Sequence, residues 1–394
     1  MPGTHEPLTE QLLEGASPAA DPHPLFARLR AEAPVAWNAE VGFWAVSRHA
    51  DVLAVATDTA TFCSSKGVLL QEIGKVYDSP PTMMHTDPPE HTAYRALVSP
   101  PLRKRVVEQM DAAVRARAVA LVEALPLGEP VDVVANLAVP YPIQVIADLL
   151  GLPDADVPKL FAWSEAAIPG ATDLSEDEVM AAMGEMTVFL IEEAAKRREA
   201  PGDDLISTVA LAELDGRRLD DFEISMFLIQ LLVAGNETTR NLISGGLVAL
   251  SQHPEQWSRL RSDRSLVPTA IEELLRWTTS VTSFMRTATV ETTLAGVPIA
   301  AGDPVLVLYG SANRDEAAFG PTASTLDVGR SPNHHLAFGF GAHFCLGAAL
   351  ARLEVATLLH LLLDRVAVIE PAGEPVPSPS TVITGLRSAP LLLR

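Results

Sequence analysis

Apolar residues recur along most of this chain every three to four positions, the spacing that places them on one face of a helix. The longest such segment covers residues 220–254, begins with acidic residues and predicts a helix much longer than average. Another strong pattern directly follows Cys345 and predicts a helix over 346–363. Further helices are expected over residues 21–34, 89–97, 103–125, 143–150, 175–198 and 268–277.

The alternating pattern of strands is much rarer and clusters in two places. Residues 34–49 alternate like a short hairpin, and residues 286–309 read as short strands joined by Gly-containing turns. Residues 380–390 near the end are also strand-like. We therefore predict a mainly α fold with small β-sheets (α+β). No repeat or long linker divides the chain, so we expect one large domain over residues 1–394, with the first ~15 residues flexible.

Composition narrows the class of protein. The formal net charge of −21 argues against a nucleic-acid partner, because phosphate binding needs clustered Lys and Arg. The chain has only two cysteines, which suits a reducing cytoplasm rather than a disulfide framework. Its start is acidic and lacks the apolar core of a signal peptide. The most apolar stretch, 226–235, is about half of the ~20 residues that a membrane-spanning helix needs, so we expect no membrane insertion.

Cys345 lies where a glycine-rich turn meets the predicted helix 346–363. There a thiol can be a nucleophile, a metal ligand or a small buried apolar side chain, and the last is the usual role of a lone cysteine. The surrounding pattern F-G-x-G-x-H-x-C-x-G favours a thiolate ligand of haem iron. Glycines let the backbone approach the macrocycle, amides stabilise the sulfur's charge, and an aromatic ring excludes water. The pattern consists of Phe338, Gly339, Gly341, His343, Cys345 and Gly347.

Two other interpretations of this turn fit less well. A zinc site built from His335, His343 and Cys345 lacks a fourth ligand and has unsuitable spacing. A dinucleotide-binding loop would need a third glycine where the chain has Phe344.

A second unusual segment, "AGNETT" (234–239), falls inside the long predicted helix. Its glycine, acid and threonines are poor choices for a helix interior. A threonine hydroxyl can bond a preceding carbonyl and loosen the helix, and Gly235 removes bulk. The segment could open a pocket for dioxygen and water beside a proton source, or it could be a crowded helix crossing with a solvated Glu237. Both interpretations remain open from the residues alone.

A third motif, "EELLR", places Glu273 and Arg276 one helical turn apart, where they can pair. Together and in this order, the three motifs resemble the cytochrome P-450 family of haem-thiolate monooxygenases, in its soluble bacterial branch. The resemblance covers nearly the whole chain. One departure is the segment 319–330, which lacks the acidic loop and aromatic residue usual before Asp327, and this leaves the local loop geometry open.

The resemblance implies haem b as the cofactor, with Cys345 as the iron ligand and Glu237 and Thr238 as the acid–alcohol pair. Propionate contacts would come from His91, Arg95, Arg286 and His343. Phe338, Gly339, Gly347, Ala234 and Gly235 would also lie against the cofactor, and Arg330 would join the Glu273–Arg276 ion pair. Taken singly, His91 and Arg95 would by default be surface residues, and His335 is expected to be structural.

The family likeness further implies insertion of one oxygen atom from dioxygen into an apolar small molecule, by hydroxylation or epoxidation. Sterols, branched fatty chains, terpenoids and polyketides are the expected substrates. By the same likeness the pocket would use Val68, Leu69, Met83, Met84, Leu232, Ala234, Val281 to Phe284, Val382 and Ile383.

Electrons are expected from a separate ferredoxin and its reductase, since no flavin or iron–sulfur module is attached, and the protein is expected to be a monomer. The basic triplet Arg103, Lys104 and Arg105 is either a solvated face or the docking site of an acidic ferredoxin. Two alternatives stay open: a peroxide-driven peroxygenase on the same fold, and a haem sensor or carrier without turnover.

Overall fold

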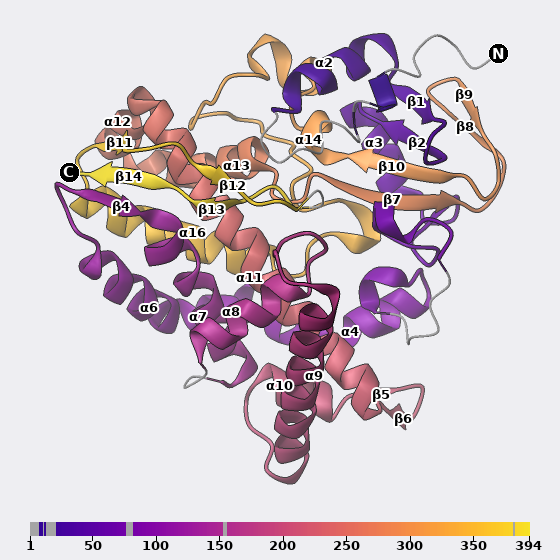
Figure 1. Cartoon of the computed structure of the whole chain (residues 1–394), viewed down its shortest axis with the longest axis horizontal. Coiled ribbons are helices and arrows are strands. Elements are labelled where there is room, and N and C mark those ends of the chain that lie inside the picture. The colour runs from indigo at the N-terminus through magenta and orange to yellow at the C-terminus, as the bar shows by residue number, and fades with distance from the viewer. Residues whose placement is uncertain (1–7, 11, 13–20, 76–81, 153–155, 381–382) are drawn as a thin grey trace.

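Helices make up most of the molecule, and the two largest sheets lie on opposite sides of it, with β4, β11 and β14 at the left and β1, β2, β7 and β10 at the right of Figure 1. The computed structural model describes residues 8–10, 12, 21–75, 82–152, 156–380 and 383–394. The expected flexibility of the first residues falls mostly outside these ranges. Within them, no helix combines the length and the apolar character needed to cross a bilayer. The prediction of a mainly α fold with small sheets is confirmed.

The helices include those expected from the periodic segments and several shorter ones that the sequence did not indicate. They are α2 (His23–Glu32), α3 (His49–Thr57), α4 (Glu90–Leu102), α5 (Lys104–Val107), α6 (Asp111–Ala124), α7 (Pro140–Leu150), α8 (Val157–Ala166), α9 (Glu176–Glu199), α10 (Leu205–Ala210), α11 (Asp221–Gln252), α12 (Pro254–Ser262), α13 (Val267–Thr278), α14 (Tyr309–Ala312), α15 (Glu316–Phe319) and α16 (Ala348–Arg365). Short turns include the 3₁₀ helices η1 (Leu70–Glu72), η2 (Met83–His85), η3 (Glu108–Met110) and η7 (Gly341–His343), and the π-helix η4 (Val134–Ala138).

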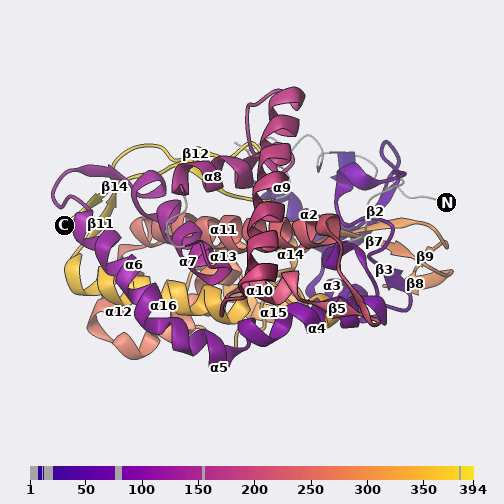
Figure 2. The ribbon, with the colours of Figure 1, turned by 90° about the horizontal axis from the view of Figure 1, so that it is seen from below.

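Helix α11 organises the helical part of the fold. It begins with a capping box in which Asp220 accepts the Glu223 backbone N–H at 2.8 Å and Glu223 accepts the Asp220 N–H at 2.8 Å. Helices α7, α8, α9, α13 and α16 all contact it, and Figure 2 shows α11 and α16 on different levels of the molecule. The predicted helix 220–254 is confirmed.

The prediction of one helix over 103–125 is wrong. Helices α5 and α6 are separated by the tighter 3₁₀ turn η3. Val107 and Val114 on either side are both buried in the same apolar core. Over a single turn, the apolar spacing of a 3₁₀ helix is too close to that of an α-helix for the sequence to distinguish them.

The two strand-rich segments of the sequence join in one five-stranded sheet. Its order is β1 (Val35–Asn38), β2 (Phe43–Val46), β10 (Pro304–Leu308), β7 (Ser283–Ala288) and β3 (Phe62–Cys63). Strand β10 pairs parallel with β2 and antiparallel with β7, with Val307 opposite Val46 on one side and Phe284 on the other. Arg286 therefore sits in the middle of a sheet, opposite Val305.

The remaining strands form small sheets. A three-stranded sheet has the order β11 (Ile369–Pro371), β14 (Pro390–Leu393) and β4 (Pro130–Asp132). The two-stranded sheets pair β5 (Glu213–Leu214) with β6 (Arg217–Arg218), β8 (Thr292–Leu294) with β9 (Val297–Ile299), and β12 (Val376–Pro377) with β13 (Leu386–Ser388).

Candidate active site

The loop before α16 holds Cys345 through its own backbone. The Cys345 N–H donates to the Phe338 carbonyl oxygen at 2.8 Å, which closes the loop. Gly341 has φ +71°, and a Cβ there would lie 2.5 Å from the Ala56 carbonyl oxygen at the end of α3. Any other residue would therefore push this loop away from α3. The glycine-rich pattern thus reflects a real close approach of two backbones.

The surroundings of the Cys345 sulfur offset part of the cost of burying a thiolate there. Burial raises the pKa of the Cys345 thiol, and a hydrogen bond from the Gly347 backbone N–H and the charges of Arg95 and Arg352 oppose that rise. Cys345 also lies at the N-terminal end of α16, where the helix dipole favours negative charge. An N–H donor at the sulfur and the charges of two arginines that act on it suit a metal–thiolate bond.

Four basic side chains gather beside this loop. The rings of His91 and His343 lie 4.1 Å apart, and His343 Nε2 is 3.2 Å from Ser64 Oγ. Burial and the charge of Arg286 lower the pKa of His343 to about 3. Arg95 has no ion-pair partner among the residues that the structure describes, and burial lowers its pKa.

Asp87 is the acid whose charge acts on both histidines. In the described part of the chain its carboxylate accepts the backbone N–H groups of Ser64 and Ser65 at 2.7 and 3.0 Å and forms no ion pair with Arg95 or Arg286. Arg95, half-buried, and Arg286, buried, are cations without an ion-pair partner among the described residues, and such cations are unfavourable unless an anion binds them. The cluster therefore fits a ligand with carboxylates, such as the two propionates of haem.

Helix α11 presents one accessible stripe. Met226, Gln230, Ala234 and Thr238 are four residues apart, and each is at least partly exposed on a helix that is otherwise mostly buried. The Thr238 hydroxyl donates to the Ala234 carbonyl oxygen at 2.9 Å. Gln230 was not predicted from the sequence, although its spacing of four from Ala234 was a usable signal. Its amide oxygen has no hydrogen-bond partner among the described residues.

The structure does not bring Leu232 to this stripe. Leu232 is 0% exposed and lies in the apolar core. Two residues along a helix correspond to a turn of about 200°, so Leu232 and Ala234 face opposite sides. Gly235 also has a packing role, because a Cβ there would lie 2.8 Å from Ile146 Cδ1 of α7. The interpretation of "AGNETT" as a crowded helix crossing is thus partly right for Gly235.

Glu237 is buried and belongs to a row of three charged side chains. Its Oε2 lies 2.5 Å from Arg240 Nη2, and Arg240 Nη1 donates to Glu165 Oε1 of α8 at 3.0 Å. Burial raises the pKa of Glu237 to about 7, against the opposing charge of Arg240. Glu165 and Arg240 line a cavity of about 780 Å³ whose walls also include Phe161 and Arg387. Glu237 is not a solvated side chain, since it is 1% exposed.

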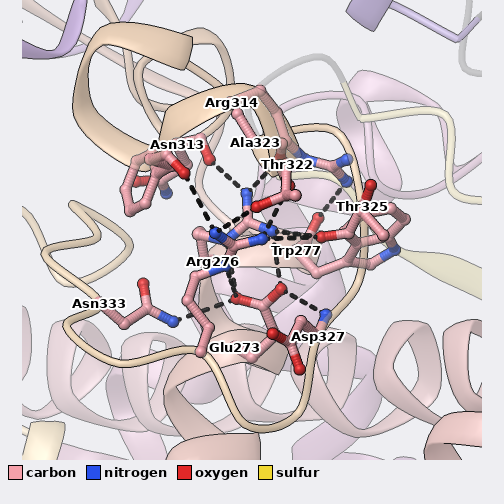
Figure 3. Close-up of polar contacts among 12 residues, drawn as sticks. Glu273, Arg276, Trp277, Asn313, Arg314, Thr322, Ala323, Thr325, Asp327 and Asn333 are labelled. Carbon is pink, nitrogen blue, oxygen red and sulfur yellow. Dashed lines mark hydrogen bonds and ion pairs between the residues drawn. The ribbon is translucent and has the colours of Figure 1, made fainter.

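The Glu273–Arg276 pair is the centre of a buried polar network (Figure 3). Two hydrogen bonds of 2.7 Å join the side chains, and Arg330 Nε donates to Glu273 Oε2 at 3.0 Å. Arg276 also donates to the carbonyl oxygens of Asn313, Ala323 and Thr325.

The network also determines the path of the loop that leads toward the cysteine. Asp327 N–H donates to Glu273 Oε1 at 2.8 Å, so the segment with the unusual sequence wraps around this ion pair.

The remaining predicted pocket residues come from four segments. Val281 and Ile383 form an isolated antiparallel bridge, and the ring of Phe284 meets Tyr309 edge-on at 6.2 Å. Leu69 N–H donates to Glu72 Oε2 at 2.9 Å, and Met83 begins η2. Leu69, Met83, Met84, Val281, Phe284 and Ile383 are half-buried, Val68 is buried, and Val382 lies outside the described residues.

The zinc alternative is wrong. In the described part of the chain, no three His, Cys, Asp or Glu side chains form a group that could hold a metal. His335 Nε2 binds Glu272 at 3.0 Å, and its Nδ1 accepts the Ala337 N–H at 3.2 Å, so both ring nitrogens are occupied. This agrees with a structural role for His335.

Comparison with known proteins identifies one family. The family model described as cytochrome P450 matches residues 143–393. A putative cytochrome P450 126 of Mycobacterium tuberculosis is 41% identical, covering 89% of this chain and 90% of its own length. A methyl-branched lipid omega-hydroxylase of M. tuberculosis is 38% identical, with 93% and 90% covered. The solved structure of Mycobacterium marinum cytochrome P450 CYP268A2 in complex with pseudoionone is 37% identical, with 97% of both chains covered and a TM-score of 0.89.

Proposed function

The chain belongs to the cytochrome P450 family, and on that premise we propose that Cys345 is the thiolate that holds the iron of its haem. Members of this family are monooxygenases that bind haem through a cysteine, so the protein is an oxidoreductase. The observation that carries the proposal is the closed loop ahead of α16, in which the Cys345 N–H donates to the Phe338 carbonyl oxygen at 2.8 Å beside the His91–His343 ring contact of 4.1 Å.

We assign the propionates to the cluster of His91, Arg95, Arg286 and His343, with Phe338 and the loop glycines against the macrocycle. Haem bound through a thiolate supplies the reductive activation of dioxygen and the cleavage of its O–O bond.

The reaction that fits best is hydroxylation or epoxidation of an apolar molecule. The candidate pocket residues are mainly aliphatic, sulfur-containing or aromatic, and Ala234 and Thr238 on α11 add small side chains. Relatives with printed activities include a steroid C26-monooxygenase of Rhodococcus jostii, 36% identical with 90% of this chain and 78% of its own length covered, and the lipid omega-hydroxylase. We propose sterols, branched fatty chains and terpenoids as the first compounds to test.

Thr238 and Glu237 are proposed to handle protons at this site. Thr238 presents its hydroxyl on the accessible stripe of α11, and Glu237 is buried with a pKa of about 7, which suits a group that takes up and releases protons near neutral pH. Arg240 and Glu165 link Glu237 to the 780 Å³ cavity. Because a guanidinium does not release its proton, Arg240 would hold the two carboxylates in place, and Glu237 would take up protons from water on that side and pass them to water ordered by Thr238.

A direct test compares turnover with an electron donor and with hydrogen peroxide alone. We expect product only with a ferredoxin, its reductase and dioxygen, after a spin-state titration has identified a binding substrate. Turnover on peroxide alone would favour the peroxygenase alternative, and binding without any turnover would favour a haem sensor or carrier.

The variant Thr238→Ala tests the proposed proton relay. In this variant we expect continued consumption of reducing equivalents, with most of them lost as hydrogen peroxide. Unchanged coupling of electron consumption to product formation in folded Thr238→Ala would refute the relay.

A further inference from the structure

A charged pair beside the cysteine loop has no part in the function proposed so far. Glu272 on α13 accepts hydrogen bonds from Arg352 Nε and Nη2 on α16, both at 2.7 Å. The same carboxylate accepts a third from His335 Nε2 at 3.0 Å. Because Nδ1 of His335 accepts the Ala337 N–H, the ring proton is assigned to Nε2. The carboxylate is thus held by one helix and by the loop that leads to the cysteine.

Arg352 connects this pair to the cysteine. Its guanidinium carbon lies 4.6 Å from the centre of the Phe338 ring, a cation–π contact, and the Phe338 carbonyl accepts the Cys345 N–H at 2.8 Å. Arg352 Nη1 also donates to the carbonyl oxygen of Ala348 at 3.4 Å, so the guanidinium reaches back to the first residue of α16, three positions after Cys345. Arg352 therefore holds Phe338 and contributes charge near the thiolate.

The negative charge of Glu272 partly cancels the positive charge of Arg352. Burial alone would raise its pKa, but the hydrogen bonds from Arg352 and His335 lower it to about 2, so the carboxylate is negative throughout the physiological range. The Arg352 side chain is 37% exposed and that of Glu272 is 28% exposed. Solvent and salt therefore weaken the field of each charge without removing it.

We propose that Arg352 and Glu272 are positioning residues with opposite effects on the reduction potential of haem bound at Cys345. Reduction adds one negative charge at the iron, so a nearby cation favours the reduced form and a nearby anion disfavours it. Arg352 would raise the potential and Glu272 would restrain it. The inference rests on the proposed haem site, but not on any particular substrate.

The test is a spectroelectrochemical titration of the substrate-free holoenzyme and its variants. We expect Arg352→Gln to shift the reduction equilibrium constant toward the oxidised form and Glu272→Gln to shift it toward the reduced form. Each shift should be on the order of threefold to tenfold, where tenfold equals about 59 mV for a one-electron couple. Both shifts should shrink as the salt concentration rises.

Three controls separate charge from structure. Arg352→Lys keeps the charge and should keep most of the parent potential, although it loses the two-point bond to Glu272. The double variant Arg352→Gln with Glu272→Gln should return close to the parent value. Arg198→Gln breaks the partly exposed Arg198–Asp221 pair of 2.6 Å, between α9 and the start of α11, and should leave the potential unchanged.

The signs of the shifts decide the outcome. Equal signs for the two single variants, or no shift in either, would overturn the proposal. If Arg352→Gln does not retain haem, Glu272→Gln still decides, because an uncompensated Arg352 must shift the equilibrium toward the reduced form. Failure of the haem-site proposal looks different: the parent itself would lack the thiolate-type spectrum of its reduced, carbon-monoxide-bound form.

Discussion

Glu237 carries a pH dependence that can be measured directly. Its pKa is raised from 4.5 to about 7 in the fold, chiefly by burial, so the folded protein holds this proton more tightly than the unfolded chain does. The contribution of the protonated Glu237 carboxyl to the free energy of unfolding is fully present below pH 4.5 and is lost as the pH rises toward 7. The total effect is on the order of 3 kcal/mol.

We expect the difference in melting temperature, parent minus Glu237→Gln, to decrease as the pH rises from 4.5 to 7. Above pH 7 this difference should stay constant. Thermal melting monitored by haem absorbance and circular dichroism would test this. The matched control is Glu199→Gln, at the exposed end of α9, which should follow the parent at every pH. A constant difference between parent and Glu237→Gln would show that this carboxyl does not titrate in the range.

A second prediction at the scale of one residue concerns the ligand itself. Cys345→His should retain haem, because Arg95, Arg286 and the two histidines proposed to bind its propionates are intact, but should lose oxygenation, because the anionic sulfur is gone. The spectrum of the reduced, carbon-monoxide-bound protein should change from the thiolate type to the imidazole type. A persisting thiolate spectrum would point to Cys63, which is buried on β3 opposite Thr287.

Among the elements, the crossing of α11 and α7 gives the sharpest test of packing. Gly235→Ala places a methyl group 2.8 Å from Ile146 Cδ1, so the two helices must shift. We expect a loss of about 1–2 kcal/mol in stability, since overpacking outweighs the gain in helix propensity.

Two further variants isolate that contact. Adding Ile146→Val removes the clashing carbon and should restore most of the loss in Gly235→Ala. Gly184→Ala, on an open face of α9 with no atom near the added methyl group, should be stabilising by about 0.5–1 kcal/mol. Melting temperatures of the three variants would test these expectations. Equal changes in melting temperature for Gly184→Ala and Gly235→Ala would show that Gly235 has no packing role.

The elements also show what the sequence could predict. The long helix α11 and the turn around Cys345 depend on local signals, namely caps, periodicity and glycines, so both were predictable. The short helices α3, α8, α10 and α12 were missed, because few residues give little periodicity and tertiary packing decides them. The pairing of Glu237 with Arg240 follows a local i, i+3 spacing, whereas Glu165 lies 75 residues from Arg240 and only the fold brings it there.

For the whole molecule, we propose the basic triplet as the docking site of an acidic ferredoxin. Arg103, Lys104 and Arg105 are exposed at the start of α5, and α5 contacts α16, the helix that follows the cysteine. Figure 2 shows α5 and α16 on the same side of the molecule. In a chain with a net charge of −21, this patch would attract an acidic ferredoxin.

Reversing the three charges to Glu should therefore slow reduction by an acidic ferredoxin at least tenfold at low salt and abolish its decrease with ionic strength. Stopped-flow reduction at several salt concentrations would measure this. Reversing Lys66, Lys75 and Arg218, which are also exposed but belong to other segments, should have little effect. Unchanged rates in the triplet variant would leave these residues as a solvated face.

The parallel pairing of β2 with β10 has a consequence for how the chain is made. Val46 leaves the ribosome long before its partner Val307, and at about 5–20 residues per second the delay is roughly 13–50 s. During that interval the apolar edge of the N-terminal hairpin has no strand beside it. We expect nascent chains that stop before β10 to bind chaperones and resist folding, and chains that extend past it to become resistant to protease. Arrested nascent chains of increasing length would reveal the step.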